Sequence, residues 1–213
     1  VSESIKRDLP VELALLPFIE SQFDPYAQSS TGASGIWQFI LSTAREQKLK
    51  KNWWYDGRRD IVASTRAAYD YLTKLHSKYD DWLLAIAAYN AGPNRISKEI
   101  KKNRAKGLSI DFWSLNLPKE TKAYVPKLLS LIEVIKNPKE FNVVIPNLPN
   151  RPYFQLVTLP SQVDLMQVAN ISGLKLEVIY ELNPGFNQWA TDPNGPFHIP
   201  VSYTHLRAHE TEA

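Results

Sequence analysis

Apolar residues recur at spacings of three and four along the first two-thirds of the chain, as in helices that bury one face. The clearest case follows Asp60, a favourable N-cap residue, and predicts a helix that runs to about Tyr79. No comparable strand pattern occurs before residue 140. The buried face of this helix is expected to carry Ile61, Thr65, Ala68, Leu72 and Leu75.

Proline, glycine and capping residues delimit the other predicted helices. Gly92 and Pro93 end a compact apolar segment, and Pro118 opens another that ends before Asn137 and Pro138. The further helices are expected at Leu9–Ser21, Ser42–Gln47, Trp82–Ala88, Pro93–Asn103 and Pro118–Lys136.

The pattern changes at VVIPNLPNRPY, where three prolines predict an extended, semi-rigid connection. Beyond it, YFQLVTL and PFHIPV read as strands on either side of two helices. The first of these helices follows a Ser-x-x-Asp capping sequence that starts at Ser161, and it ends at Gly173. We therefore predict a helical domain at 1–142, a linker at 143–152, a βααβ domain at 153–201 and a disordered or non-native tail at 202–213.

The composition is that of a folded protein, because 44% of the 213 residues are hydrophobic and 11% are aromatic. Cysteine is absent, which excludes disulfides, thiolate catalysis and cysteine-ligated zinc. No run reaches the roughly 18 to 20 apolar residues of a spanning helix, and Val1 opens without a signal-peptide pattern.

Charge is distributed unevenly along the chain. Residues 1–150 carry 22 Lys and Arg against 16 Asp and Glu, whereas residues 151–213 carry 3 against 6. A basic first part suits an anionic polymer such as a cell-wall glycan or a nucleic acid, although solvated helix faces carry similar charge.

Several kinds of chemistry lack their residues. The sequence has no glycine-rich phosphate loop. His205 and His209 stand four apart, but the Glu that follows the first His of a zinc motif is missing. No serine has a suitable histidine partner for a hydrolytic triad. We therefore expect neither a metal nor a cofactor.

One carboxylate stands inside an apolar run, LALLPFIESQF. On a helix from Leu9, Glu20 shares a flank with Leu13 and Leu16. Apolar walls favour a neutral carboxyl, which can hold a proton near neutral pH and donate it. The alternative is a glutamate that points to water from the end of a helix.

Three further stretches carry polar groups suited to a sugar, and each also has a structural explanation. In TGASGIWQFI, Gln38 follows two glycines and stands between aromatics, an arrangement that suits a sugar ring. The alternative is a tight turn followed by core aromatics. AAYNAGP places Tyr89 and Asn90 at a helix end, where they contact a ligand or cap the helix. LPKETKAYVPKLL puts Glu120 and Tyr124 on one helix face, which packing also explains.

Taken in order, the Glu-Ser pair, G-x-x-G-x-W-Q-F, A-Y-N-A-G and K-E-T-K-A-Y-V resemble the catalytic domain of the lytic transglycosylases of bacterial cell walls. The resemblance covers nearly the whole chain and implies a lysozyme-like fold. It implies that Glu20 is the catalytic acid and base, and it leaves Glu120 an architectural role. The substrate-binding residues that it implies are Ser21, Gln38, Tyr89, Asn90 and Tyr124, with Tyr124 near the carboxyl.

The resemblance also implies a mechanism with one carboxylate. Glycosidases normally use two, and these motifs contain no second one, because Asp24 before Pro25 reads as a turn. In this family a lone glutamate protonates the glycosidic oxygen between N-acetylmuramic acid and N-acetylglucosamine, and the substrate's acetamido group stabilises the anomeric carbon. The carboxylate then takes the C6 hydroxyl proton, and a 1,6-anhydro ring closes without water. We expect Glu20 to be largely buried at the floor of a groove, with no carboxylate facing it.

Residues 153–201 resemble a LysM module, a βααβ fold that binds N-acetylglucosamine-containing glycans chiefly through its LNPG helix end. Two loops depart from that pattern: Leu159–Gln162 replaces a Gly-Asp-Thr turn, and QWATDPNGP is inserted before the last strand. Both loops usually contact sugar. Glycan binding by residues 152–200 and a structural brace for the catalytic domain therefore both stay open.

The expected fold class is mainly α, with a lysozyme-like helical catalytic domain followed by a small βααβ LysM-like domain. The expected activity is non-hydrolytic cleavage of peptidoglycan strands by a monomer that binds no nucleic acid. We expect it in the periplasm of the bacterial cell envelope, anchored to the outer membrane through a segment outside this chain. The alternatives are a goose-type lysozyme with water as acceptor and a non-catalytic peptidoglycan-binding protein.

Overall fold

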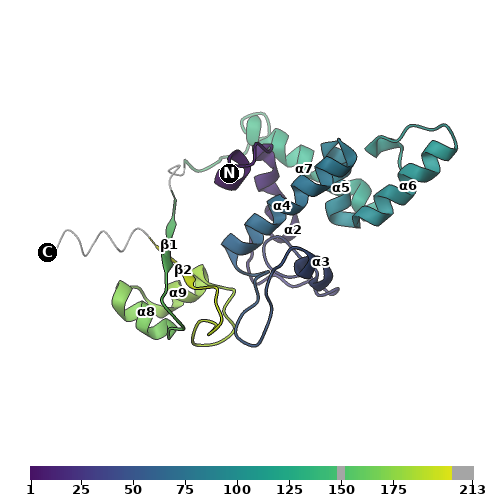
Figure 1. Ribbon diagram of the computed structural model, residues 1–213. Helices are drawn as coiled ribbons and strands as arrows, with labels where there is room; N and C mark the ends of the chain where they lie inside the picture. Colours follow the sequence, from purple (N-terminus) through teal and green to yellow (C-terminus); the bar gives the residue numbers. More distant parts are fainter. Residues whose placement is uncertain (148–151, 203–213) are drawn as a thin grey trace. The chain divides into compact units, whose positions relative to one another are not determined.

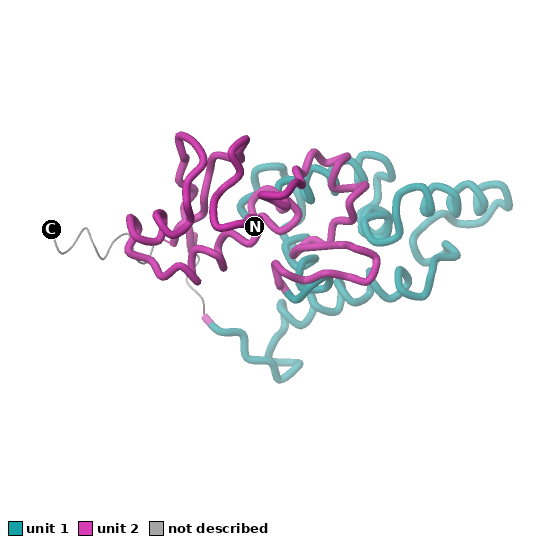
Figure 2. Tube along the Cα trace, turned by 90° about the horizontal axis from the view of Figure 1, so that it is seen from below, with its two compact units in different colours: residues 1–22, 66–146 teal, residues 23–65, 147–213 magenta. Residues whose placement is uncertain are grey.

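The computed structural model describes residues 1–147 and 152–202 (Figure 1). Residues 148–151 of the expected linker and 203–213 of the expected tail, which include His205 and His209, lie outside the described residues. The chain forms two compact units (Figure 2). Unit 1 joins Val1–Gln22 to Arg66–Pro146, and unit 2 joins Phe23–Thr65 to the described part of Asn147–Ala213.

The secondary structure is mostly helical before residue 147 and mixed after residue 152 (Figure 1). The helical elements of the first part are α1 (Ser2–Ile5), the 3-10 turn η1 (Val11–Leu15), α2 (Leu16–Ser21), α3 (Leu41–Glu46), α4 (Ile61–Tyr79), α5 (Trp82–Ala91), α6 (Pro93–Ala105), the 3-10 turn η2 (Phe112–Ser114) and α7 (Lys119–Lys136). The elements that follow are β1 (Phe154–Thr158), α8 (Leu165–Ser172), α9 (Leu176–Leu182) and β2 (His198–Ser202).

The capping residues named from the sequence set most of the helix ends. Asp60 precedes α4, and its Oδ1 accepts a hydrogen bond from the backbone N–H of Ala63 at 2.7 Å. Pro118 is the N-cap of α7, and Gly92 separates α5 from α6. The predicted helices at these positions are confirmed within a few residues, as is the βααβ order of the C-terminal part.

Two local predictions are wrong. The single helix expected over Leu9–Ser21 is a 3-10 turn followed by α2, because Pro17 lacks an N–H and fits only the first turn of a helix. The cap of α8 is Asp164, whose carboxylate accepts from the N–H of Met166 at 2.7 Å. Ser161, the expected cap, lies three residues before it.

Within unit 1, α5 is the central helix. It packs against α6 and α7, while α2 packs against η1 and α7. The middle of α5, from Leu84 to Ala88, is buried, so this helix is apolar on every side. The packing of α2 on α7 joins residues about a hundred positions apart and builds the site described below.

Within unit 2, β1 and β2 pair antiparallel, with Phe154 opposite Ser202 and Thr158 opposite His198. Helices α8 and α9 contact each other, and α9 contacts β2. The core of this module also includes Tyr55, whose ring lies 5.5 Å from that of Phe186. The segment before α4 is therefore part of the same hydrophobic core as the C-terminal module.

No helix within residues 1–147 and 152–202 has the length and apolar character needed to cross a bilayer.

Candidate active site

Glu20 is the last residue but one of α2. Leu16 and Pro17 at the start of this helix are buried and hold it against its neighbours. The helix ends at Gln22, which adopts a left-handed conformation with φ 54° and donates its N–H to the carbonyl of Phe18 at 3.0 Å. The carboxyl of Glu20 is thus held on a short helix whose two ends are both fixed, and its side chain is half-buried.

Tyr124 of α7 supplies a hydrogen bond to this carboxyl. Its hydroxyl donates to Oε1 of Glu20 at 2.5 Å, and its side chain is buried. Desolvation raises the pKa of Glu20 from 4.5 to about 7, while the Tyr124 hydrogen bond acts in the opposite direction. Glu20 is therefore a carboxyl that can exchange its proton near neutral pH.

Tyr89 of α5 lies beside the same carboxyl. Desolvation and the charge of Glu20 both raise the pKa of the Tyr89 phenol, so its hydroxyl stays protonated. Its ring lies 5.7 Å from that of Tyr71 on α4, at an interplanar angle of 50°. The phenols of Tyr89 and Tyr124 thus lie on two different helices near one titrating group.

Asn90 is oriented by two neighbours at the start of α7. Its Oδ1 accepts from the hydroxyl of Thr121 at 2.8 Å, and its Nδ2 donates to Oε1 of Glu120 at 3.4 Å. Thr121 is buried and Glu120 is exposed. These two contacts fix which way the amide of Asn90 faces, a feature that the sequence pattern did not reveal.

The charge of a second carboxylate acts on Glu20, which the expectation that no carboxylate faces it did not include. The charge of Glu120 contributes to the raised pKa of Glu20, although burial contributes more. Glu120 is exposed, whereas most of Glu20 is covered, which agrees with the expectation that it is largely buried. An architectural role was expected for Glu120, and its position in the first turn of α7 adds an electrostatic role.

Within unit 1, Tyr124 contacts Glu20 and Tyr89 interacts with its charge. Asn90 instead contacts Glu120, whose charge acts on Glu20. Ser21 follows Glu20 directly, and its hydroxyl donates to the carbonyl of Pro17 at 3.2 Å. These residues come from α2, α5 and α7.

Gln38 belongs to unit 2, and its side chain hydrogen-bonds to the backbone of its own loop. Its Nε2 donates to the carbonyls of Gly35 at 2.8 Å and Ala27 at 3.2 Å, and its φ is 48°. The flanking Trp37 and Phe39 are buried, which supports the core interpretation of these two aromatics. Gln38 itself stays a predicted substrate-binding residue.

No group of three or more His, Cys, Asp or Glu side chains is placed to hold a metal ion in the part of the chain that the structure describes.

Comparisons with known proteins identify the families that the two parts of the chain match. The family described as Transglycosylase SLT domain matches residues 2–112, which is more than half of the chain. The family described as Lytic transglycosylase MltD, LysM-like domain matches residues 153–206. The first part of the chain thus matches one class, the transglycosylases of the SLT type. The chain belongs to this family.

Individual relatives point the same way. The chain is 45% identical over 201 residues to membrane-bound lytic murein transglycosylase D of Escherichia coli K12, which covers 94% of the chain and 44% of that protein. It is 41% identical over 152 residues to a protein of Alteromonas sp. named for tributyltin chloride resistance, which covers 70% of the chain and 72% of that protein. The chain thus spans less than half the length of the E. coli relative.

Among solved structures, the chain is similar to an inactive glutamate-to-glutamine mutant of the lytic transglycosylase Slt from Pseudomonas aeruginosa. The TM-score is 0.50 at 29% sequence identity, and the match covers 67% of this chain and 24% of that one. The predicted fold class is confirmed.

Proposed function

We propose that this chain cleaves the β-1,4 bond between N-acetylmuramic acid and N-acetylglucosamine in peptidoglycan without hydrolysis. The observation that carries the proposal is the half-buried Glu20, with its pKa raised to about 7 and its carboxyl bound by Tyr124. The relatives named lytic murein transglycosylases supply the substrate class.

In the first step Glu20 acts as a general acid. Its proton passes to the glycosidic oxygen while the bond from that oxygen to C1 of the muramic acid breaks. The acetamido group of the same sugar stabilises the positive charge at C1. A carboxyl with a pKa near 7 is protonated often enough at neutral pH to perform this step.

In the second step the same group acts as a base. The Glu20 carboxylate, which Tyr124 stabilises by its hydrogen bond, takes the proton of the C6 hydroxyl. The C6 oxygen then bonds to C1 and closes the 1,6-anhydro ring, so Glu20 ends the cycle protonated as it began. No water is consumed, and no second carboxylate has to act as a nucleophile.

The remaining residues are assigned to substrate binding. We assign to Asn90, which Thr121 and Glu120 orient, hydrogen bonds to the amide and hydroxyl groups of the sugars. Ser21, Gln38, Tyr89 and Tyr124 complete the proposed set. We further propose that the protein works in the periplasm on the peptidoglycan of the cell envelope, anchored to the outer membrane in the full-length protein.

The test separates an enzyme from a binding protein. Purified peptidoglycan is incubated with the wild type, and the soluble muropeptides are measured over time. Release of fragments by the wild type supports the proposal. Peptidoglycan that binds the protein and stays intact would favour a non-catalytic binding protein.

The pH dependence of cleavage should respond to the two neighbours of Glu20 in opposite directions. The general acid must be protonated, so the rate should fall above about pH 7, the pKa of Glu20. The Glu120→Gln substitution removes a charge that raises this pKa, and the fall should move to lower pH. The Tyr124→Phe substitution removes a hydrogen bond that lowers it, and the fall should move to higher pH.

The control is Glu133→Gln, an exposed glutamate on the same helix α7 that should leave the profile in place. The measurement is kcat/KM from pH 5 to pH 9 for all four proteins. Profiles of Glu120→Gln and Tyr124→Phe that move in the same direction, or not at all, would contradict the assignment of the titrating group.

A further inference from the structure

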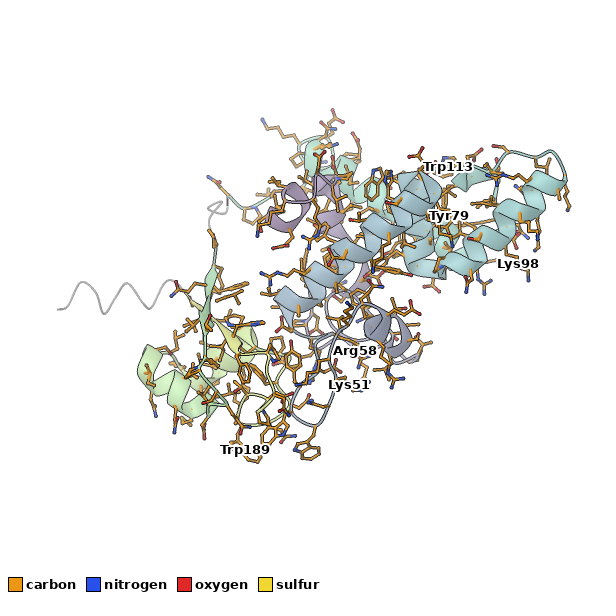
Figure 3. The ribbon with its side chains drawn as sticks, viewed as in Figure 1. Lys51, Arg58, Tyr79, Lys98, Trp113 and Trp189 are labelled. Atoms are coloured by element: carbon orange, nitrogen blue, oxygen red, sulfur yellow. The ribbon has the colours of Figure 1, made fainter. Side chains whose placement is uncertain are left out.

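Three tryptophans lie together at the surface of unit 2. Trp53 and Trp54 precede α4. Trp189 lies in the loop between α9 and β2 (Figure 3). The side chains of Trp53 and Trp189 are 71% and 60% exposed. The ring of Trp54 meets that of Trp189 edge to face at 5.7 Å. We call Trp53, Trp54 and Trp189 the tryptophan platform.

Such exposure requires an explanation. Burying a tryptophan removes a large apolar area from water, so most tryptophans are at least partly covered. Contiguous exposed aromatic surface on a soluble protein marks a site of interaction. Of the three tryptophans, only Trp54 packs against the hydrophobic core of unit 2. Core packing therefore does not explain why the other two are present.

Hydrogen bonds hold the two loops of the platform to each other. The N–H of Asn187 donates to the carbonyl of Trp54 at 2.8 Å, and Nε2 of Gln188 donates to the carbonyl of Trp53 at 3.2 Å. The carbonyl of Trp189 accepts from the N–H of Leu165 at 2.8 Å, which ties its loop to α8. The exposed rings therefore stand on a fixed backbone, and little order has to be gained when a ligand binds.

The charges beside the platform favour an anionic ligand. Asp192 is fully buried and pairs with Lys50 at 2.7 Å, and Asp56 is buried and pairs with Arg58 at 2.7 Å. Lys51 is exposed and lies 3.9 Å from Asp56, whose charge Arg58 already balances (Figure 3). Among the described residues of these two loops, the exposed charge is thus positive.

The polar groups beside the rings are amides. Asn52 and Asn187 are exposed, and Gln188 is half-buried. Exposed indole rings match the apolar C–H face of a pyranose ring. The amides of Asn52, Asn187 and Gln188 hydrogen-bond within the two loops, so they hold the rings in place.

We propose that the tryptophan platform is a glycan-binding site for N-acetylated amino-sugar strands that carry carboxylates, in a unit other than that of Glu20. The inference rests on the proposed function for the identity of the polymer. Trp53 and Trp54 lie outside residues 153–206, the part that matches the LysM-like family, so the site depends on a segment that this family does not include. A second contact of this kind raises the effective concentration of the strand at the enzyme.

The test measures binding in a protein that does not cleave. In the Glu20→Gln background, Trp53→Ala and Trp189→Ala are compared with the parent by co-sedimentation with purified peptidoglycan. Titration with soluble N-acetylglucosamine oligomers, followed by tryptophan fluorescence, gives the dissociation constants. We expect each substitution to weaken binding about 10-fold, since each removes one stacking ring.

The matched control is Trp113→Ala, because Trp113 is 63% exposed but lies in unit 1 beside Phe112. It should bind peptidoglycan like the parent. Melting temperatures of all variants show whether they fold.

Two outcomes separate this inference from the proposed function. Folded platform variants that bind as tightly as the parent would overturn the glycan-binding site, whatever the wild type cleaves. A wild type that cleaves nothing, together with platform variants that lose binding, would overturn the proposed reaction and leave the glycan site supported.

Discussion

The Glu20→Gln substitution is expected to lower the rate of peptidoglycan cleavage by at least about 100-fold, the usual contribution of a positioned general acid and base. Glutamine keeps the shape of the side chain and an oxygen that can accept from Tyr124, so the site stays folded. It cannot give or take the proton. The measurement is the rate of soluble muropeptide release at saturating enzyme.

The same variant should also change the pH dependence of stability. Between about pH 4.5 and about pH 7 the folded wild type keeps on Glu20 a proton that the unfolded chain has released. The folded state then binds more protons than the unfolded state, so wild-type stability falls as the pH rises through this window. The Glu20→Gln variant has no such group. The melting temperature of the variant minus that of the wild type should therefore increase from pH 4.5 to pH 7.

The control substitution is Glu12→Gln in η1, a surface glutamate that pairs with Lys136 at 3.1 Å. It should leave the rate, and the pH dependence of stability above pH 4.5, within error of the wild type, because the pKa of Glu12 is lowered and the group stays charged in that range. A Glu20→Gln protein that cleaves at the wild-type rate would remove Glu20 from the mechanism.

The Arg58→Met substitution is expected to lower the free energy of unfolding of unit 2 by about 3–5 kcal/mol, the usual cost of leaving a buried charge unpaired. The side chain of Arg58 is 3% exposed and binds both carboxylate oxygens of Asp56, at 2.7 and 3.0 Å. It also donates to the carbonyls of Gly32 at 2.7 Å and Phe39 at 3.2 Å. These bonds hold the loop that carries Gln38.

Urea unfolding of the full chain, followed by tryptophan fluorescence, measures this loss. The matched control is Lys51→Met, which removes the exposed cation 3.9 Å from the same carboxylate and should cost less than about 1 kcal/mol. Equal losses for the two substitutions would show that the buried ion pair does not stabilise the unit.

Local signals in the sequence were enough for most of the fold. Asp60 before an apolar-periodic segment, proline at helix starts and Gly92 between helices act through bonds within a few residues of each other. The error at Leu9–Ser21 also has a local origin. Pro17 has no N–H to donate, so a new helix begins next to it. Ser161 shows the limit of a motif, because Asp164 offers an equally good cap one turn later.

Glycine in the SGIWQF stretch shows what the pattern could and could not indicate. The two glycines of this stretch allow the backbone to approach another group closely, but they do not say which group. A Cβ on Gly35 would lie 2.0 Å from the carbonyl oxygen of Arg58, and φ is +79°. The neighbouring group is thus the chain's own backbone, which only the folded structure reveals.

The candidate site was predictable only in part. The apolar neighbours of Glu20 are local and correctly indicated a raised pKa. The hydrogen bond from Tyr124 joins residues 104 positions apart, and the charge of Glu120 acts on Glu20 because α7 packs on α2. Such long-range electrostatic terms depend on helix packing, which no sequence pattern encodes residue by residue. The segment of Trp53–Tyr55 was likewise not expected in the core of the C-terminal module.

The most direct test of the central claim is the chemistry of the cleaved ends. Peptidoglycan is digested by the wild type in heavy-oxygen water, and the released muropeptides are analysed by mass spectrometry, with the Glu20→Gln variant as the blank. The proposed reaction predicts anhydro-muramyl ends that are lighter than hydrolysed ends by one water molecule and carry no heavy oxygen. Reducing ends that carry heavy oxygen would show hydrolysis and contradict the proposed transglycosylation.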